Sequence, residues 1–148
     1  LSATFSHPKI TIVPEAVGKA EGEVSFYKGD SDYEGSLLDH DMSFEKFTNF
    51  ITVPCTTLDA YFKNKQLDFV KLDVEGSEWE VFEGARRLLE DRNIIWQVEF
   101  HLDEHWEKRH FLYELGYNIY DLDFNKLSVD APRPYLAFVA KQDLSNEN

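Results

Sequence analysis

Apolar residues recur along this chain in short runs, and amphipathic stretches separate them, as in proteins whose strands alternate with helices. The most strongly apolar runs, Leu67–Asp73 and Ile94–Phe100, predict two buried parallel strands. Ile10–Val17 is rich in β-branched residues, and Glu23–Lys28 alternates apolar with polar positions, so each predicts a strand. Ile51–Pro54 is a further short candidate strand.

Helix signals lie between these strands. A threonine cap followed by an early acid predicts a helix over Thr56–Asn64. A capping box, with Glu80 three residues after Ser77, predicts a second helix that runs to about Asp91. The third predicted helix, Asp103–Leu115, ends at Gly116.

The chain closes with two predicted strands, Tyr117–Leu122 and Tyr135–Lys141. The segment between them is too short for a crossover helix, so we expect them to pair antiparallel. Strands alternating with helices, followed by this hairpin, predict an α/β three-layer sandwich. Residues 29–50 have mixed composition and read as a loop with room for a short strand or helical turn. With no repeat or linker, residues 1–148 predict a single domain.

Composition and charge narrow the class of partner. The chain has 15 Lys and Arg against 28 Asp and Glu, a formal net charge of −13. Nucleic-acid backbones and anionic membrane surfaces attract basic stripes, and none is visible, so we expect neither as a partner. No apolar run approaches the roughly 20 residues of a spanning helix. The single cysteine, Cys55, allows no internal disulfide and favours a reducing, cytoplasmic location.

Polar side chains cluster where the two buried strands end. Because side chains alternate along a strand, Lys71, Asp73 and Glu75 point to one side of the chain. The neighbouring strand ends near Glu99 and His101, and ligands bind beyond the carboxyl ends of parallel strands. We expect these five residues, the rim cluster, to converge. Crowded carboxylates suit a general base, and Lys71 needs Asp73 or Glu99 as a partner inside a buried strand.

The rim cluster leaves other interpretations open. Asp73, Glu75, Glu99 and His101 are ligands that a hard divalent cation accepts, as in a metal-dependent hydrolase. Alternatively, Lys71 and Glu99 form a structural ion pair, and the acids only favour a helix N-terminus. A separate interpretation is a non-catalytic interaction module that keeps the sheet, in which an exposed sheet edge would pair two copies into a homodimer.

Several motifs, in this order, resemble the FkbM family of methyltransferases. The resemblance implies a Rossmann-like, class I S-adenosylmethionine-dependent fold. It also implies methyl transfer to a hydroxyl of a sugar or small natural product, so a carbohydrate or other small-molecule acceptor. The motifs that carry it are Ala16-Val17-Gly18, Val53–Asp59, Lys71–Glu78, Gly84-Ala85, Val98–His101 and Leu115-Gly116-Tyr117.

The resemblance also suggests roles for individual residues. Asp73, Glu75, Glu99 and His101 match the positions from which a base takes the hydroxyl proton, without singling out one of them, and Lys71 would orient the carboxylates. The expected cofactor contacts lie in two parts of the chain: Ala16, Val17, Asp73 and Val74. Three aromatic residues are candidates to stack on a sugar ring: Tyr27, Tyr33 and Trp79.

One part of the family pattern is missing. The family's first strand with its glycine-rich loop, and its second strand with the acid that holds the ribose, have no counterpart, and no G-x-G pattern occurs. We therefore expect a sheet that lacks its first two strands, in an N-terminally incomplete domain. Close approach to the cofactor needs those glycines, so we expect these residues alone to bind S-adenosylmethionine weakly.

Overall fold

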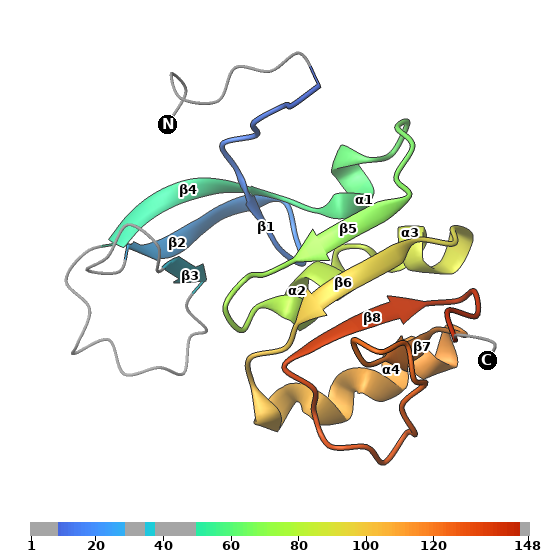
Figure 1. Ribbon diagram of the computed structural model, residues 1–148. Coiled ribbons are helices and arrows are strands. Elements are labelled where there is room, and N and C mark those ends of the chain that lie inside the picture. Colours follow the sequence, from blue (N-terminus) through green and yellow to red (C-terminus); the bar gives the residue numbers. More distant parts are fainter. Residues whose placement is uncertain (1–8, 29–34, 38–49, 146–148) are drawn as a thin grey trace.

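The computed structural model describes residues 9–28, 35–37 and 50–145, and its strands form two four-stranded sheets (Figure 1). The first sheet has the order β1-β4-β2-β3. In it β1 pairs parallel with β4, and β2 pairs antiparallel with both β4 and β3. Its strands are β1 (Ala16–Val17), β2 (Gly22–Lys28), β3 (Gly35–Leu37) and β4 (Phe50–Thr56).

In the first sheet one strand is shorter than predicted and another is longer. Of Ile10–Val17 only the last two residues pair, with Ala16 opposite Cys55, while Ile10 is 56% exposed. The β-branched composition was a local signal, and pairing also requires a neighbouring strand. The predicted strand at Ile51–Pro54 is confirmed and extends to Thr56. Residues 29–50 were predicted as a loop with room for a short strand, and most of them lie outside the described residues. The short strand β3 is the described part of this segment apart from the first residue of β4.

The second sheet carries the two strands that end at the rim cluster. Its order is β5-β6-β8-β7, with β5 parallel to β6, and β8 antiparallel to both β6 and β7. The predicted parallel pair and the terminal antiparallel hairpin are therefore confirmed. The strands are β5 (Phe69–Leu72), β6 (Ile95–Glu99), β7 (Asn118–Tyr120) and β8 (Leu136–Ala140).

The second predicted helix is broken into α2 (Glu78–Glu83) and α3 (Arg86–Asp91). The break lies at Gly84, where the chain touches the backbone after β1: a Cβ built on Gly84 would lie 2.0 Å from the carbonyl oxygen of Gly18. The Gly84 carbonyl accepts a hydrogen bond from the backbone N–H of Asp59 at 3.0 Å. This crossing between distant segments fixes the position of the break.

Capping differs from the prediction at both of the first two helices. Thr57, rather than Thr56, caps the short helix α1 (Leu58–Tyr61) by accepting from the N–H of Ala60 at 3.1 Å. Ser77 makes no capping hydrogen bond with its side chain. The carboxylate of Asp59 serves α3 instead, accepting from the N–H groups of Arg87 and Leu88 at 2.9 Å each.

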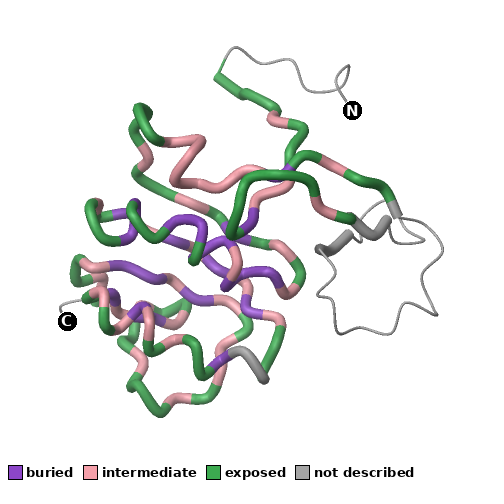
Figure 2. Tube along the Cα trace, turned by 180° about the vertical axis from the view of Figure 1, so that it is seen from behind, coloured by how far each residue is buried: buried purple, intermediate pink, exposed green. Residues whose placement is uncertain are grey.

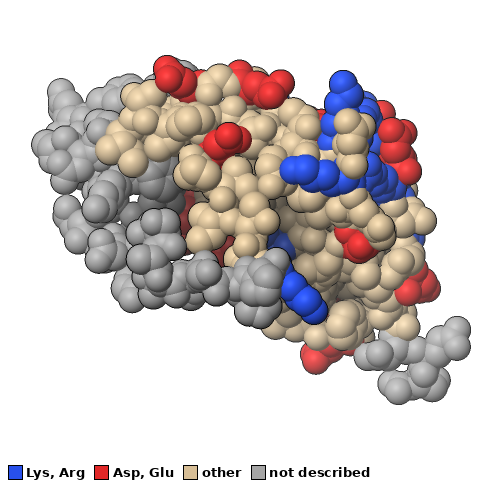
Figure 3. All heavy atoms as spheres, turned by 90° about the horizontal axis from the view of Figure 1, so that it is seen from above, with Lys and Arg blue, Asp and Glu red and all other residues tan. Residues whose placement is uncertain are grey.

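The third predicted helix begins as a 3-10 helix, η2 (Asp103–Arg109), and continues as α4 (His110–Glu114). Gly116 follows with a φ of 82°, the left-handed conformation expected after a helix end. None of the helices in the described ranges is both long enough and apolar enough to cross a membrane. Lys and Arg side chains gather at one side of the face in Figure 3, which also carries Asp and Glu side chains.

The core lies between the second sheet and its helices (Figures 1 and 2). On β6, Trp96 and Val98 are fully buried, and the Trp96 ring lies 5.1 Å from that of Phe82 on α2. The opposite face is partly covered by the loop before β8, where Phe124 stacks on Phe138. The described residues thus form a mixed α/β structure with helices on one face of this sheet. The expected three-layer arrangement is not seen in them.

Because helices cover one face only, β5 is not buried on both sides as predicted. Phe69 is 51% exposed and the Lys71 side chain 55% exposed, whereas Leu72 is buried. The apolar run at Leu67–Asp73 therefore marked the strand correctly but overstated its burial.

Candidate functional site

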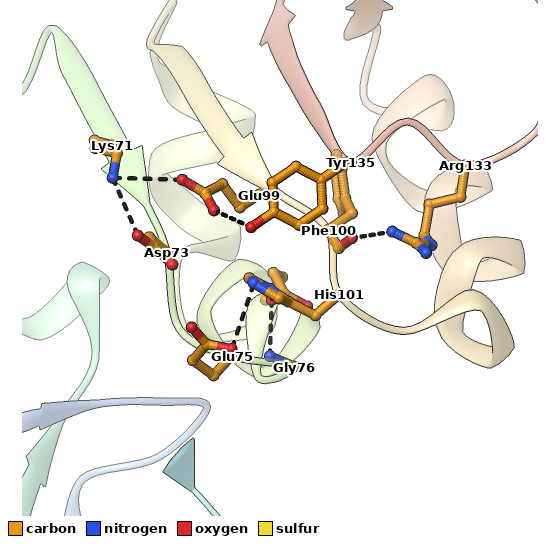
Figure 4. A network of polar contacts seen from close by, with 10 residues as sticks. Lys71, Asp73, Glu75, Gly76, Glu99, Phe100, His101, Arg133 and Tyr135 are labelled. Atoms are coloured by element: carbon orange, nitrogen blue, oxygen red, sulfur yellow. Dashed lines mark hydrogen bonds and ion pairs between the residues drawn. The ribbon is translucent and has the colours of Figure 1, made fainter. Parts of the chain in front are cut away.

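The structure brings the rim cluster together beyond the carboxyl ends of β5 and β6 (Figure 4). The Nζ of Lys71 lies 3.1 Å from Oδ2 of Asp73 and 3.5 Å from Oε1 of Glu99. Lys71 thus binds both carboxylates that the sequence offered as its partners, at the surface rather than inside a buried strand. Its pKa is raised, first by the hydrogen bond to Asp73 and then by the charges of Asp73 and Glu99.

Tyr135 joins the cluster from the residue before β8. Its hydroxyl donates a 2.8 Å hydrogen bond to Oε2 of Glu99, and this raises the pKa of Tyr135. The N–H of Phe100 donates to the Tyr135 carbonyl at 2.8 Å, which extends the pairing of β6 and β8 to this point. The sequence marked Tyr135 as the start of a strand, but only the strand register places its hydroxyl at Glu99.

His101 is held by a second carboxylate that the sequence did not assign to the site. Its Nδ1 lies 2.8 Å from Oε1 of Glu78, whose side chain is only 1% exposed. The same Oε1 accepts from the N–H of Gly76 at 2.9 Å. On the other side of the ring, Nε2 lies 3.5 Å from Oε2 of Glu75. The capping-box pattern predicted that Glu80 would accept a hydrogen bond from a backbone N–H at the start of the helix. In the structure Glu78 accepts such a bond instead, from Gly76.

Opposing effects act on the pKa of His101. Partial burial of the ring lowers the pKa, and it is the largest single effect. The hydrogen bond that His101 donates to Glu78 and the negative charges of Glu75, Glu78 and Asp73 act in the other direction and outweigh it. The net result is a pKa above the ordinary value for histidine.

A tight turn connects β5 to α2 and positions Glu75 and Glu78 next to His101. Glu75 has a φ of 49° and Gly76 a φ of 103°, so two consecutive residues adopt left-handed conformations. A glycine fits such a φ without strain, whereas Glu75 is in a costly conformation that the surrounding contacts must maintain. A Cβ on Gly76 would also lie 3.1 Å from the side chain of Leu102. The glycine therefore serves the turn itself.

The expected cofactor residues fall in two places. Ala16 and Val17 form β1, and Val17 lies in the wall of a surface hollow of about 160 Å³. Val74 packs against the core, and Asp73 is bound to Lys71. The hollow includes none of the rim cluster. It is lined by Val13, Glu15, Val17, Thr56, Leu58, Tyr61 and Phe62.

The apolar wall of this hollow is of the kind on which a purine ring packs. The turn after Val17 contains Gly18 and Gly22, but the described residues hold no G-x-G loop of the kind that closely approaches a ribose or a methionine group. The apolar lining is compatible with an adenine ring, and the described residues form no defined cradle for the rest of S-adenosylmethionine.

The structure also bears on two further predictions, a divalent cation site in the rim cluster and aromatic residues that stack on a sugar ring. Asp73, Glu99 and His101 each offer an atom within 4.8 Å of the others, but the ammonium group of Lys71 already lies between the two carboxylates. Trp79 is buried against Phe100, so its predicted stacking on an acceptor is wrong. The other two stacking candidates, Tyr27 and Tyr33, have side chains outside the described residues.

Comparison with known protein families identifies the family of this chain. A family model described as Methyltransferase FkbM domain matches residues 2–119. The matched stretch contains the whole rim cluster and Glu78, whereas Tyr135 lies beyond it. No curated protein and no solved structure matched the chain.

Proposed function

The chain belongs to the FkbM methyltransferase family, and on that premise we propose that it transfers a methyl group from S-adenosylmethionine to a hydroxyl of a sugar or small natural product. The observation that carries the proposal is the rim cluster. Within the matched residues, Asp73, Glu99 and His101 lie together at the ends of adjacent parallel strands. Acceptors bind at this edge in open α/β sheets.

S-adenosylmethionine, when bound, supplies a methyl carbon whose bond to sulfur breaks as an acceptor oxygen attacks it, with the electron pair passing to sulfur. The rim cluster supplies what this reaction needs from the protein, a proton acceptor and groups that orient a hydroxyl. Lys71 fixes the carboxylates of Asp73 and Glu99 beside His101. Val17 and the hollow around it are the proposed adenine contact.

The proposal extends to the architecture. We infer one methyltransferase-like domain over residues 1–148, with both sheets as parts of a Rossmann-like fold, and a cytoplasmic location. Contacts across the chain support the single domain: Val17 of β1 and Leu58 of α1 pack against the core of the second sheet, and Gly84, which follows α2, touches Gly18.

The metal-dependent hydrolase has less support, because Lys71 occupies the position between Asp73 and Glu99 that a cation would take. The homodimer remains part of the proposal. Among the described strands, β5 pairs with β6 alone, so its outer edge is open to a second copy.

The test combines calorimetric binding of S-adenosylmethionine with transfer of a labelled methyl group to a panel of hydroxylated acceptors. We expect weak binding of S-adenosylmethionine by calorimetry, label on an acceptor hydroxyl at a cofactor concentration high enough to offset that weak binding, and a loss on the order of 10²-fold or more in His101→Asn, as for removal of a general base. Glu114→Gln, at an exposed position on α4, is the matched control and should retain full activity. Absence of label on every hydroxyl acceptor would overturn the proposal.

A further inference from the structure

We propose that Glu78 and His101 form a base dyad, in which Glu78 holds the imidazole so that Nε2 takes the proton of the acceptor hydroxyl. This inference rests on the proposed function and deepens it. In the dyad, His101 is the catalytic residue that meets the acceptor, and Glu78 is a positioning residue that acts through it.

The burial of Glu78 is the first observation. A carboxylate that is 1% exposed is costly to keep inside a protein unless its partners satisfy it. The partners of Glu78 are the N–H of Gly76 and Nδ1 of His101, both on Oε1. An acid that only stabilised the helix N-terminus would need no histidine and could remain in solvent. Glu78 instead turns back across the β5–α2 turn to meet the end of β6.

The second observation is the direction of the imidazole. A carboxylate only accepts hydrogen bonds, so the 2.8 Å contact places a hydrogen on Nδ1 of His101. In the neutral ring the lone pair is then on Nε2. That nitrogen faces the rim cluster, with Glu75 at 3.5 Å (Figure 4). The His101 side chain is 16% exposed, so an acceptor can approach a ring that is otherwise held by protein.

Charged groups around the ring favour the protonated product of this transfer. An imidazolium would meet Glu78 at Nδ1 and Glu75 at Nε2, while the charge of Asp73 acts from the end of β5. From the side of β8, the Tyr135 ring lies edge-on at 5.7 Å. Lys71 and Glu99 are further charges of the rim cluster, and they are paired with one another. The raised pKa of His101 agrees with this balance.

Each of the other candidates for the base has a charged partner, and that of Glu75 is Nε2 of His101 itself, at 3.5 Å. Asp73 and Glu99 share the ammonium group of Lys71, and Glu99 also accepts the hydroxyl hydrogen of Tyr135. Both carboxylates are therefore suited to orient an acceptor by accepting hydrogen bonds from it. In the transfer, the acceptor O–H bond breaks, its proton passes to Nε2 of His101, and the oxygen bonds to the methyl carbon as the carbon–sulfur bond of the sulfonium donor breaks.

The closing experiment reads the histidine directly by ¹⁵N NMR of imidazole-labelled protein. In the unsubstituted chain we expect His101 to carry its proton on Nδ1 when neutral, and to titrate above the ordinary histidine pKa. In Glu78→Gln the amide replaces the carboxylate, so we expect the pKa of His101 to fall and the tautomer preference to weaken. Glu83→Gln, an exposed position on the same helix, is the matched control and should leave both unchanged.

Kinetics supply the second arm. Because an amide can present its own N–H to Nδ1 and select the wrong tautomer, we expect Glu78→Gln to lower kcat by about 10²-fold or more with little change in KM. Glu78→Asp keeps the charge and should recover part of the loss. The tautomer is read in the unsubstituted chain, so the proposal remains testable even if Glu78→Gln does not fold.

The outcomes separate the two proposals. A neutral His101 protonated on Nε2, or a pKa and tautomer that Glu78→Gln leaves unchanged, overturns the dyad. Full methyl transfer by His101→Asn overturns the dyad and leaves the methyltransferase proposal standing. A chain that methylates no hydroxyl acceptor overturns both.

Discussion

The hydroxyl of Tyr135 donates a 2.8 Å hydrogen bond to Oε2 of Glu99 and so ties the start of β8 to the end of β6. The two residues lie 36 positions apart in the chain. The bond leaves Oε1 of Glu99 to Lys71, so each oxygen of this carboxylate has its own partner. Tyr135 is nevertheless 62% exposed, which places an aromatic ring on the open side of the rim cluster.

Removing the charge of Glu99 should change the titration of Tyr135. The anionic carboxylate accepts the phenol hydrogen and opposes a second negative charge, which raises the pKa of Tyr135. In Glu99→Gln we expect this pKa to fall toward the ordinary value of tyrosine, as followed by NMR of ring-labelled protein. Tyr113, whose pKa is raised mainly by burial, is the internal control and should not move. An unchanged Tyr135 would show that the hydrogen bond is absent in solution.

His101 should make the stability of the protein depend on pH. Its pKa is higher in the folded state than in the unfolded chain, so the imidazolium contributes stability. That contribution is fully present below the unfolded-state pKa and is lost as the pH rises through the folded-state pKa. We therefore expect the free energy of unfolding, measured with urea, to decline from pH 5 to pH 8. This decline should be smaller in His101→Gln than in the unsubstituted protein. The same decline in both proteins would contradict the prediction.

Gly84→Ala should destabilise the fold strongly. The added Cβ would lie 2.0 Å from the Gly18 carbonyl oxygen, a backbone atom that cannot move aside cheaply. We expect a cost of about 3 kcal/mol in the free energy of unfolding, measured by urea denaturation. Gly116→Ala is the control: it has open space around it but a φ of 82°, so it should cost only about 1 kcal/mol. Equal costs would mean that α2 and β1 do not make this close contact.

Removal of Lys71 should expose a latent cation site. In Lys71→Ala, the carboxylates of Asp73 and Glu99 lose the ammonium group between them and remain next to His101. We expect Mn²⁺ to raise the Tm of this variant, and the rise should exceed that of the unsubstituted chain by about 2 °C or more. Lys63→Ala, at an exposed position before β5, controls for the loss of a positive charge. An equal Mn²⁺ shift without any substitution would instead support the metal-dependent hydrolase.

The proposed homodimer makes a prediction for the edge of the second sheet. Phe69 on the outer strand β5 is half exposed, and a charge on an edge strand opposes pairing with another strand. We expect analytical ultracentrifugation to show a dimer that Phe69→Lys weakens at least about tenfold in Kd, a cost of about 1.4 kcal/mol. Glu114→Lys, at an exposed position on α4, should have no effect. A stable monomer at all concentrations would contradict the dimer.

Local pattern was enough to predict much of the fold. Runs of apolar residues located β5 and β6, and the short connection before β8 indicated an antiparallel hairpin. The pattern could not show where α2 ends, because the break at Gly84 depends on contact with Gly18, 66 positions earlier in the printed sequence. It also could not show that, within the described residues, helices cover only one face of the second sheet.

The sequence likewise predicted part of the candidate site, and the rest is visible only in the tertiary structure. Alternation along a strand depends on backbone geometry alone, so the sequence by itself determined that Lys71 and Asp73 share a side and that Glu99 and His101 lie near the end of the next strand. Only the tertiary structure decided that Glu78 is buried against His101 and that Tyr135 reaches Glu99. Those contacts arise from strand register and helix packing, which join residues that no local periodicity relates.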